Sequence, residues 1–421
     1  DITAVYSSDG IAGVADDGSI VITGGPSVAQ LNDVSELTTG TVTATVTSDM
    51  ATLLGITESD NALTISVTGD FNATDLIALR AKTTGVITVD AAATMTGSFT
   101  DSDTLLTLND VTNIRDINVT LSDASNTVAE VNAITLVSTG TLTATITETS
   151  AIGVDGDDGL QDITTAGAYT ITLARDSVEQ VDGTAAVESV SSDLIAAIDA
   201  LTTEVLVVTS SEITGTAAEI QTALELDTPV DGSDGTVSGL TTVDINIDDG
   251  TASVTNINDI GALTSGVITA NMDDATIDAY IDEAGDGSLL LNETGNALTL
   301  NLIDFDNVSA AHINTLDNAT TGTITFVDLA TILGELSDLT TLYASSNEET
   351  PGVAGISGLD VTVIDVGEIS ASELNAINDE TAGVVTIDAS VTSITGLAAD
   401  QITAASAADG GEILSLLGAL D

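Results

Sequence analysis

One pattern of hydrophobic and polar positions recurs seven times along the chain. It begins with Ser, Thr or Asn, carries aliphatic residues at positions +4 and +7, and ends at position +13, usually in Gly. These boxes start at Ser27, Asn72, Thr127, Ser191, Ser253, Ser309 and Ser370. Aliphatic residues at this spacing lie on one helical face, and Ser, Thr and Asn are favoured just before a helix. Each box therefore predicts a helix of about three turns, ended by a Gly in the left-handed conformation.

Short runs of β-branched residues with a period of two follow every box. They start at Thr41, Val86, Thr141, Val205, Val267, Thr323 and Val384. Similar runs precede several boxes, and a second helical stretch lies between some boxes, most clearly from Ile213 and from Ile394. Each repeat thus reads strand–helix–strand–helix. This order predicts parallel strand pairing with right-handed crossovers.

A single repeat of this kind cannot bury both of its faces, so neighbouring repeats have to stack. The expected fold class is α/β: an elongated repeat solenoid with a parallel β-sheet on one side and short helices on the other. A pure β-solenoid, in which the boxes are only turns, is the alternative. Residues 1–26 are expected to form an N-terminal cap or junction. Six repeats are expected in residues 27–369, and a seventh repeat with a C-terminal cap or junction in residues 370–421.

The charge of the chain limits its partners. It has 66 Asp and Glu against 4 Lys and Arg, a formal net charge of −62. Nucleic acids and anionic membrane surfaces bind Lys/Arg patches, so both are excluded as partners. Uncompensated carboxylates repel one another, which predicts screening by bound divalent cations or by salt. Halophilic adaptation would explain the acid excess without any metal.

Catalytic chemistry has few candidates in this chain. It contains no Cys and a single histidine, His312, at position +3 of its box, where a surface residue is expected. These residues cannot assemble a Cys nucleophile or a histidine-based metal site, and no Ser-His-Asp triad stands out. No pair of carboxylates stands out among so many. The chain is therefore expected not to be an enzyme.

The chain has no apolar run near the roughly 18 residues that a membrane-spanning helix needs, so no membrane insertion is expected. It begins at Asp1 and carries no signal peptide. These features suggest a processed product or a segment of a longer protein.

Acidic turns that contain Gly are the best candidates for a binding site. Ca²⁺ takes about 6 to 8 oxygen ligands, which closely spaced carboxylates and backbone carbonyls supply. Asp and Gly also form ordinary turns that bind no metal. The candidate ligands are Asp155, Asp157, Asp158, Asp231, Asp234, Asp248, Asp249, Asp304 and Asp306. Ca²⁺ is accordingly the expected cofactor.

Three segments resemble repeats of giant Thr- and Asp-rich surface proteins of marine cyanobacteria. They read SAAHINTLDNATTGTIT from Ser309, ITGTAAEIQTA from Ile213 and LTTLYASS from Leu339. Some members of that group are implicated in swimming motility or the cell-surface layer. The resemblance implies an extracellular, repetitive, calcium-dependent protein, and it supplies no catalytic residues.

The leading hypothesis is an extracellular structural protein: a self-assembling subunit of a surface layer, sheath or filament, with itself or neighbouring surface components as partners. An adhesin or spacer segment of a giant surface protein is the alternative. Polysaccharide cleavage ranks lower, as does ice binding through a ladder of the third strand residues, Thr43, Thr88, Thr143, Thr269, Thr325 and Thr386. Asn at position +5 of five boxes is expected either to form a ladder or to tie down a turn.

Overall fold

The computed structural model describes residues 17–153, 158–177, 189–228, 235–282, 288–292, 294–303, 307–327, 329–347 and 352–415. These residues divide into two compact units. The first holds the described residues up to 177 with Leu194–Thr209 and Gly235–Ser238, and the second holds Ser189–Asp193, residues 210–228 and the described residues beyond Gly239.

All seven boxes form α-helices, each beginning one residue after the first residue of its box. The box helices are α2 (Val28–Ser35), α4 (Ala73–Arg80), α6 (Val128–Val137), α7 (Ser192–Asp199), α9 (Val254–Gly261), α10 (Ala310–Asp317) and α12 (Ala371–Glu380). The first residue accepts a hydrogen bond from the N–H at position +3 in the boxes of Ser27, Thr127, Ser253 and Ser370. The prediction of helices at the boxes is confirmed, and the alternative of a pure β-solenoid is wrong.

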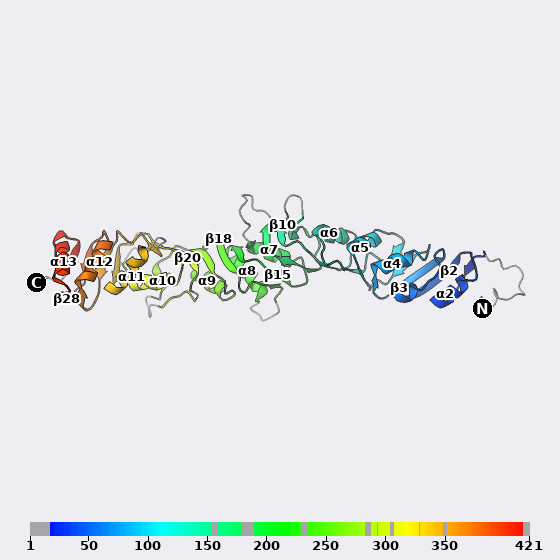
Figure 1. Cartoon of the computed structure of the whole chain (residues 1–421), viewed down its shortest axis with the longest axis horizontal. Helices are drawn as coiled ribbons and strands as arrows, with labels where there is room; N and C mark the ends of the chain where they lie inside the picture. The colour runs from blue at the N-terminus through cyan, green and yellow to red at the C-terminus, as the bar shows by residue number, and fades with distance from the viewer. Residues whose placement is uncertain are drawn as a thin grey trace, which may run out of the picture. The chain divides into compact units, whose positions relative to one another are not determined.

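Further helices lie between the boxes and after the last box. They are α3 (Met50–Leu53), α5 (Phe99–Leu106), α8 (Ala217–Asp227), α11 (Leu336–Ser346) and α13 (Ala398–Gly410), with 3₁₀ turns at Leu160–Asp162 and Ile277–Ala279. The helical stretches predicted after Ile213 and Ile394 are confirmed as α8 and α13. In the second unit, α10, α11, α12 and α13 pack each against the next in chain order, and Figure 1 shows the last three as a row.

The first unit contains four sheets, and all of their strand pairs are parallel. One has the order β1 (Ile20–Val21), β2 (Val42–Asp49), β3 (Ala62–Thr68), β5 (Ile87–Val89), β7 (Val111–Thr112). A second has the order β4 (Phe71–Asn72), β6 (Thr94–Gly97), β8 (Asn118–Leu121), β9 (Leu142–Thr145), β11 (Ala168–Thr170). The small sheets are β10 (Ser150–Ile152) with β13 (Arg175–Ser177), and β12 (Thr172–Leu173), β15 (Leu206–Val208), β17 (Val237–Ser238).

The second unit contains three sheets, again with parallel strand pairs. The largest has the order β14 (Ser189–Ser191), β16 (Glu212–Gly215), β18 (Asp244–Ala252), β19 (Ile268–Met272), β20 (Ala297–Leu302), β22 (Ile324–Phe326), β24 (Val353–Ala354). Another has the order β21 (Asn307–Ser309), β23 (Thr331–Gly334), β25 (Asp360–Val363), β27 (Val385–Ile387), β29 (Ile413–Ser415), and β26 (Gly367–Ser370) pairs with β28 (Val391–Thr395). Parallel pairing is therefore confirmed.

The register shows a structural period shorter than the interval between boxes. Ile87 of β5 pairs with Val111 of β7, and Leu300 of β20 pairs with Ile324 of β22. In both cases the partners are separated along the chain by about half of the interval between successive boxes. Among the paired strands this separation is smallest between β2 and β3 and largest between β12 and β15. We call one strand region with the helix or turn that follows it a module, so one box interval spans about two modules.

The core lies between the strands and the helices. In β2, Val42, Ala44 and Val46 are buried and the intervening Thr side chains are exposed, because successive strand residues face opposite sides. Each box helix contributes a buried aliphatic pair from positions +4 and +7. These pairs are Leu31/Val34, Leu76/Leu79, Val131/Ile134, Ile195/Ile198, Ile257/Ile260, Ile313/Leu316 and Leu374/Ile377. The predicted helical stripe is confirmed.

Candidate functional site

The Thr at position +11 joins each box to the preceding module. Thr83 Oγ1 accepts from the N–H of Leu63 and donates to its carbonyl, both at 2.9 Å. Thr320 makes the same two contacts with Leu298, at 2.8 and 2.9 Å. Six boxes have Thr here and one has Ser: Thr38, Thr83, Ser138, Thr202, Thr264, Thr320 and Thr381. The hydroxyl serves as donor and acceptor for backbone groups at the edge of a neighbouring strand.

The Gly at position +13 lies against the same preceding strand. In five of the six boxes that end in Gly, its N–H donates to the Thr hydroxyl two residues earlier, as Gly383 does to Thr381 at 2.9 Å. A Cβ at Gly85, Gly266 or Gly383 would overlap the carbonyl oxygen of Leu63, Val243 or Leu359. None of the box glycines has a positive φ. The prediction of a left-handed helix end is therefore wrong: the backbone passes so close to the neighbouring strand that no side chain fits.

The Asn at position +5, which five boxes have, joins the box helix to the following module. Asn132 donates from Nδ2 to the carbonyl of Asp162 at 2.8 Å and accepts at Oδ1 from the N–H of Thr164 at 2.9 Å. Asn258 bridges the carbonyl of Leu290 and the N–H of Asn292 in the same way, at 2.9 and 2.8 Å. These side chains bond to backbone and not to one another. Of the two alternatives that the sequence left open, an Asn ladder or a side chain that fixes a turn, the structure shows the second.

Asn258→Ala is expected to lower the free energy of unfolding of the second unit by about 2 kcal/mol, since two hydrogen bonds of about 1 kcal/mol are lost. Asn375→Ala is the matched control in the same unit, because Asn375 donates to the Asp400 carbonyl at 2.9 Å while its Oδ1 has no partner. We expect about half the loss for the control. Denaturant unfolding of both variants checks this, and equal losses would contradict the two-bond tie.

The residue at position +8 varies between the boxes, and in four of them its side chain contacts the residue just before a strand of a later module. Ser35 Oγ accepts from Asn61 Nδ2 at 3.2 Å, and Asp199 Oδ2 accepts from Thr236 Oγ1 at 3.0 Å. The other direct contacts are Arg80 Nε to Asp110 Oδ2 at 3.1 Å and Asn378 Nδ2 to Glu412 Oε2 at 3.5 Å. Arg80 with Asp110 is the one ion pair among the described residues.

The predicted metal ligands lie mostly outside the described residues. Asp155, Asp157, Asp231, Asp234, Asp304 and Asp306 are in this group. Asp158 is exposed before the 3₁₀ turn at Leu160–Asp162, and Asp248 and Asp249 are exposed in a bulge of β18 that shifts the register between Ile247 and Ala252. Within the described part of the chain, no three acidic or histidine side chains group closely enough to hold a metal ion.

The carboxylates of β16 and β18 repel one another. Burial raises the pKa of Glu212 above its usual value, and the negative charges of Asp244 and Asp248 raise it further, against a hydrogen bond from Asn246. A raised pKa in the folded state means that this group contributes stability below its unfolded pKa, near 4.3, and loses it as the pH rises through the folded pKa. Charged Glu212 therefore destabilises the second unit at neutral pH.

Glu212→Gln is expected to raise the unfolding midpoint of the second unit at pH 7, with a gain that shrinks as the pH falls through the folded pKa and is gone below about pH 4. Glu219→Gln provides a control of opposite sign. Hydrogen bonds from the Thr216 side chain and backbone lower the pKa of Glu219, so its charge stabilises above the unfolded pKa and this is lost on acidification. Denaturant midpoints at pH 7 and pH 4 decide, and a lower midpoint for Glu212→Gln at pH 7 would contradict the repulsion.

Comparison with protein-family models found no match to the chain, and comparisons with curated proteins and with solved structures also found none. None of the described helices combines the length and the apolar composition needed to cross a bilayer.

The Thr residues proposed for an ice-binding ladder do not stack on one another. Thr88 pairs with Ser66 and Thr112, and Thr269 pairs with Asn246 and Ala297. The predicted continuous ladder is wrong, because a strand of the intervening module lies between the strands that follow successive boxes.

His312 is half-buried in the first turn of α10. The contacts that the +11 hydroxyls and the +8 side chains make with neighbouring modules were not predicted from the sequence, although Thr or Ser at +11 of every box was a visible signal.

Proposed function

We propose that this chain is an extracellular structural protein whose modules stack into one elongated solenoid, as a subunit of a surface layer, sheath or filament. One observation carries the proposal: the Asn at +5, the Thr or Ser at +11 and the Gly at +13 contact a neighbouring module, as do the polar side chains at +8 of several boxes. The residues that recur in the boxes are therefore those that stack one module on the next. A load-bearing or space-filling protein depends on this stacking. The chain carries out no catalysis in this proposal.

Self-assembly follows from the way the modules join. Within the described residues, β29 has a strand partner only on its β27 side and β1 only on its β2 side. A parallel edge of this kind offers backbone donors and acceptors to a further strand. Leu414 on β29 is 51% exposed, so an added strand would also cover apolar surface. We propose that the partner is a second copy of the chain or a neighbouring surface component.

We propose that Ca²⁺ ions hold neighbouring copies of the chain together, and the support for this is electrostatic. The net charge of −62 opposes any close approach of two copies. The exposed carboxylates of Asp248 and Asp249 lie beside the sheet surface, and the neighbouring Glu212 already has a raised pKa. Divalent cations bound by such oxygen ligands would lower this repulsion.

Addition of Ca²⁺ to EDTA-treated protein at fixed ionic strength is expected to increase light scattering through assembly, while Mg²⁺ at the same concentration does not. Circular dichroism recorded in parallel reports whether the chain orders at the same step. A NaCl titration separates general screening from specific binding, since halophilic adaptation predicts the same response to salt alone. Protein that is folded and monomeric under all three conditions would refute assembly and favour a spacer segment.

A further inference from the structure

In two places a buried Asn follows a box and precedes the next strand, but the two Asn side chains have different surroundings. Asn61 lies just before β3 and Asn296 just before β20, and each is 5% exposed. Asn61 Oδ1 accepts from the N–H of Val42 at 3.0 Å, and Asn296 Oδ1 accepts from the N–H of Ile268 at 2.8 Å. The two amides therefore have the same orientation relative to the strand that they support.

The amide nitrogens of these two residues meet different partners at position +8. Asn61 Nδ2 donates to the hydroxyl of Ser35, which is itself buried. The residue that corresponds to Ser35 is Gly261, at the end of α9, and it has no side chain to offer. Asn296 Nδ2 accordingly has no acceptor among the described residues.

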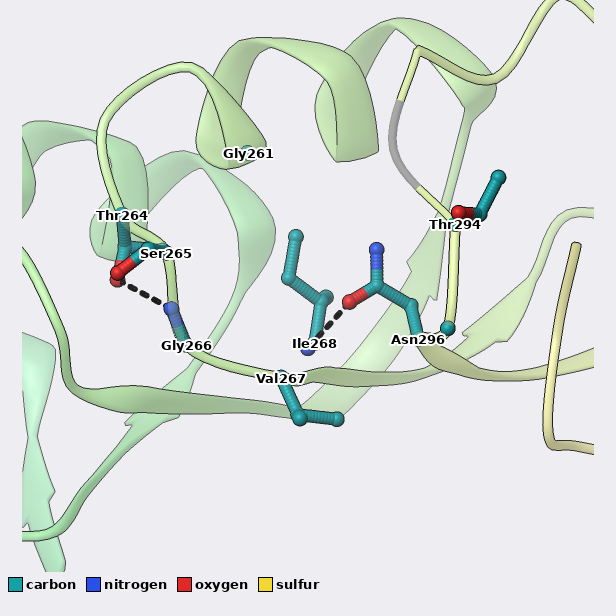
Figure 2. Close-up of a pocket in the computed structure, with 9 residues that line it drawn as sticks. Gly261, Thr264, Ser265, Gly266, Val267, Ile268, Thr294 and Asn296 are labelled. Atoms are coloured by element: carbon teal, nitrogen blue, oxygen red, sulfur yellow. Dashed lines mark hydrogen bonds between the residues drawn. The ribbon is translucent and has the colours of Figure 1, made fainter.

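A cavity of about 100 Å³ occupies the place of the missing side chain, between Gly261, Thr264, Ile268 and Asn296. Figure 2 shows the nitrogen of the Asn296 amide pointing toward the helix that carries Gly261, while the amide oxygen faces the N–H of Ile268. A cavity needs only about 10–15 Å³ of such space to hold a water molecule, so this one has room for ordered water. The pocket is partly open to solvent, and an amide N–H that faces it without a protein acceptor favours a bound water at this place.

We propose that this cavity is a hydration site, in which an ordered water molecule accepts from Asn296 Nδ2 and takes the position that the Ser35 hydroxyl has in the first box. The chemistry of the site selects water. The group that faces the cavity is a donor, which does not ligate a cation, and a net charge of −62 opposes an anion. Thr264 and Thr294 also line the cavity and offer hydroxyl groups to further waters.

Gly261→Ser tests the site, with Gly261→Ala as the matched control, in the full-length chain. Both variants remove a Gly from a helix, and Ala is intrinsically the better helix former. Only Ser supplies an acceptor to Asn296 Nδ2. We therefore expect the thermal unfolding midpoint of the second unit to be about 2 °C or more higher for the Ser variant than for the Ala variant. A midpoint equal to or below that of the Ala variant would overturn the proposal.

A high-resolution crystal structure tests the water directly. We expect a water oxygen at about 2.9 Å from Asn296 Nδ2 in the unmodified chain, replaced by the Ser hydroxyl in the Gly261→Ser variant. The reverse change, Ser35→Gly, is expected to open the corresponding cavity at Asn61 and to admit a water there, which keeps the test in force if either Gly261 variant misfolds. A dry cavity at Gly261, or a protein acceptor for Asn296 Nδ2, would contradict the hydration site.

Discussion

Gly383→Ala is expected to lower the free energy of unfolding of the second unit by about 3 kcal/mol, at the upper end of what overpacking costs. The added Cβ would overlap the carbonyl oxygen and carbon of Leu359, and both are backbone atoms that cannot turn aside. Relief requires that the chain move away from Leu359 and β25, which also weakens the hydrogen bond that Thr381 Oγ1 donates to the Leu359 carbonyl at 2.6 Å.

Gly358→Ala is the matched control for that substitution. It lies in the same unit, has no positive φ, and its Cβ would meet nothing within 4 Å. Both substitutions lower the conformational entropy of the unfolded chain by the same amount, which by itself stabilises the fold. We therefore expect the control to be neutral or slightly stabilising. Denaturant unfolding measures both. A Gly383→Ala variant as stable as the control would contradict the close approach of neighbouring modules.

Ile134→Ala is expected to destabilise the first unit by about 2–5 kcal/mol, the usual cost of truncating a fully buried aliphatic side chain. Ile134 occupies position +7 of the third box and is 0% exposed. Its truncation leaves a cavity between α6 and the strands beneath, and the hydrogen bonds from Asn132 to Asp162 and from Ser138 to Arg115 limit how far α6 can collapse into it.

Leu136→Ala in the same helix separates core packing from helix propensity. Leu136 is 86% exposed two residues further on, so its truncation removes little buried surface. We expect a change within about 0.5 kcal/mol, measured by chemical denaturation beside Ile134→Ala. Similar losses for the two variants would mean that the stripe at +4 and +7 does not face the core.

The box helices could be predicted because each carries all its signals locally. A capping residue, the buried aliphatic pair and the terminal Gly lie within one short segment, as in Ser27 to Gly40. The order strand–helix–strand–helix predicted two modules in each box interval, but the helices between boxes were located clearly only after Ile213 and Ile394, because the others carry weaker signals. Helix α11 follows Glu335, whose side chain makes no cap hydrogen bond, and α3 is little more than a single turn.

The role of the terminal Gly was predicted wrongly for a physical reason. A left-handed turn and a close backbone approach both require the absence of a Cβ, so the residue type alone does not distinguish them. The contacts at +8 escaped notice because Ser35, Arg80 and Asp199 share no chemistry. Their relation becomes visible only with their partners Asn61, Asp110 and Thr236 in place.

Small-angle X-ray scattering of the full chain, first in EDTA and then with Ca²⁺ or Mg²⁺ at fixed ionic strength, tests the proposed solenoid and its assembly most directly. The account predicts the distance distribution of a rod in EDTA, and a longer rod of unchanged cross-section with Ca²⁺ alone. Strands about 4.8 Å apart set the length that each module adds. A compact particle whose distance distribution does not respond to Ca²⁺ would contradict both the stacking of the modules into one solenoid and their end-to-end addition.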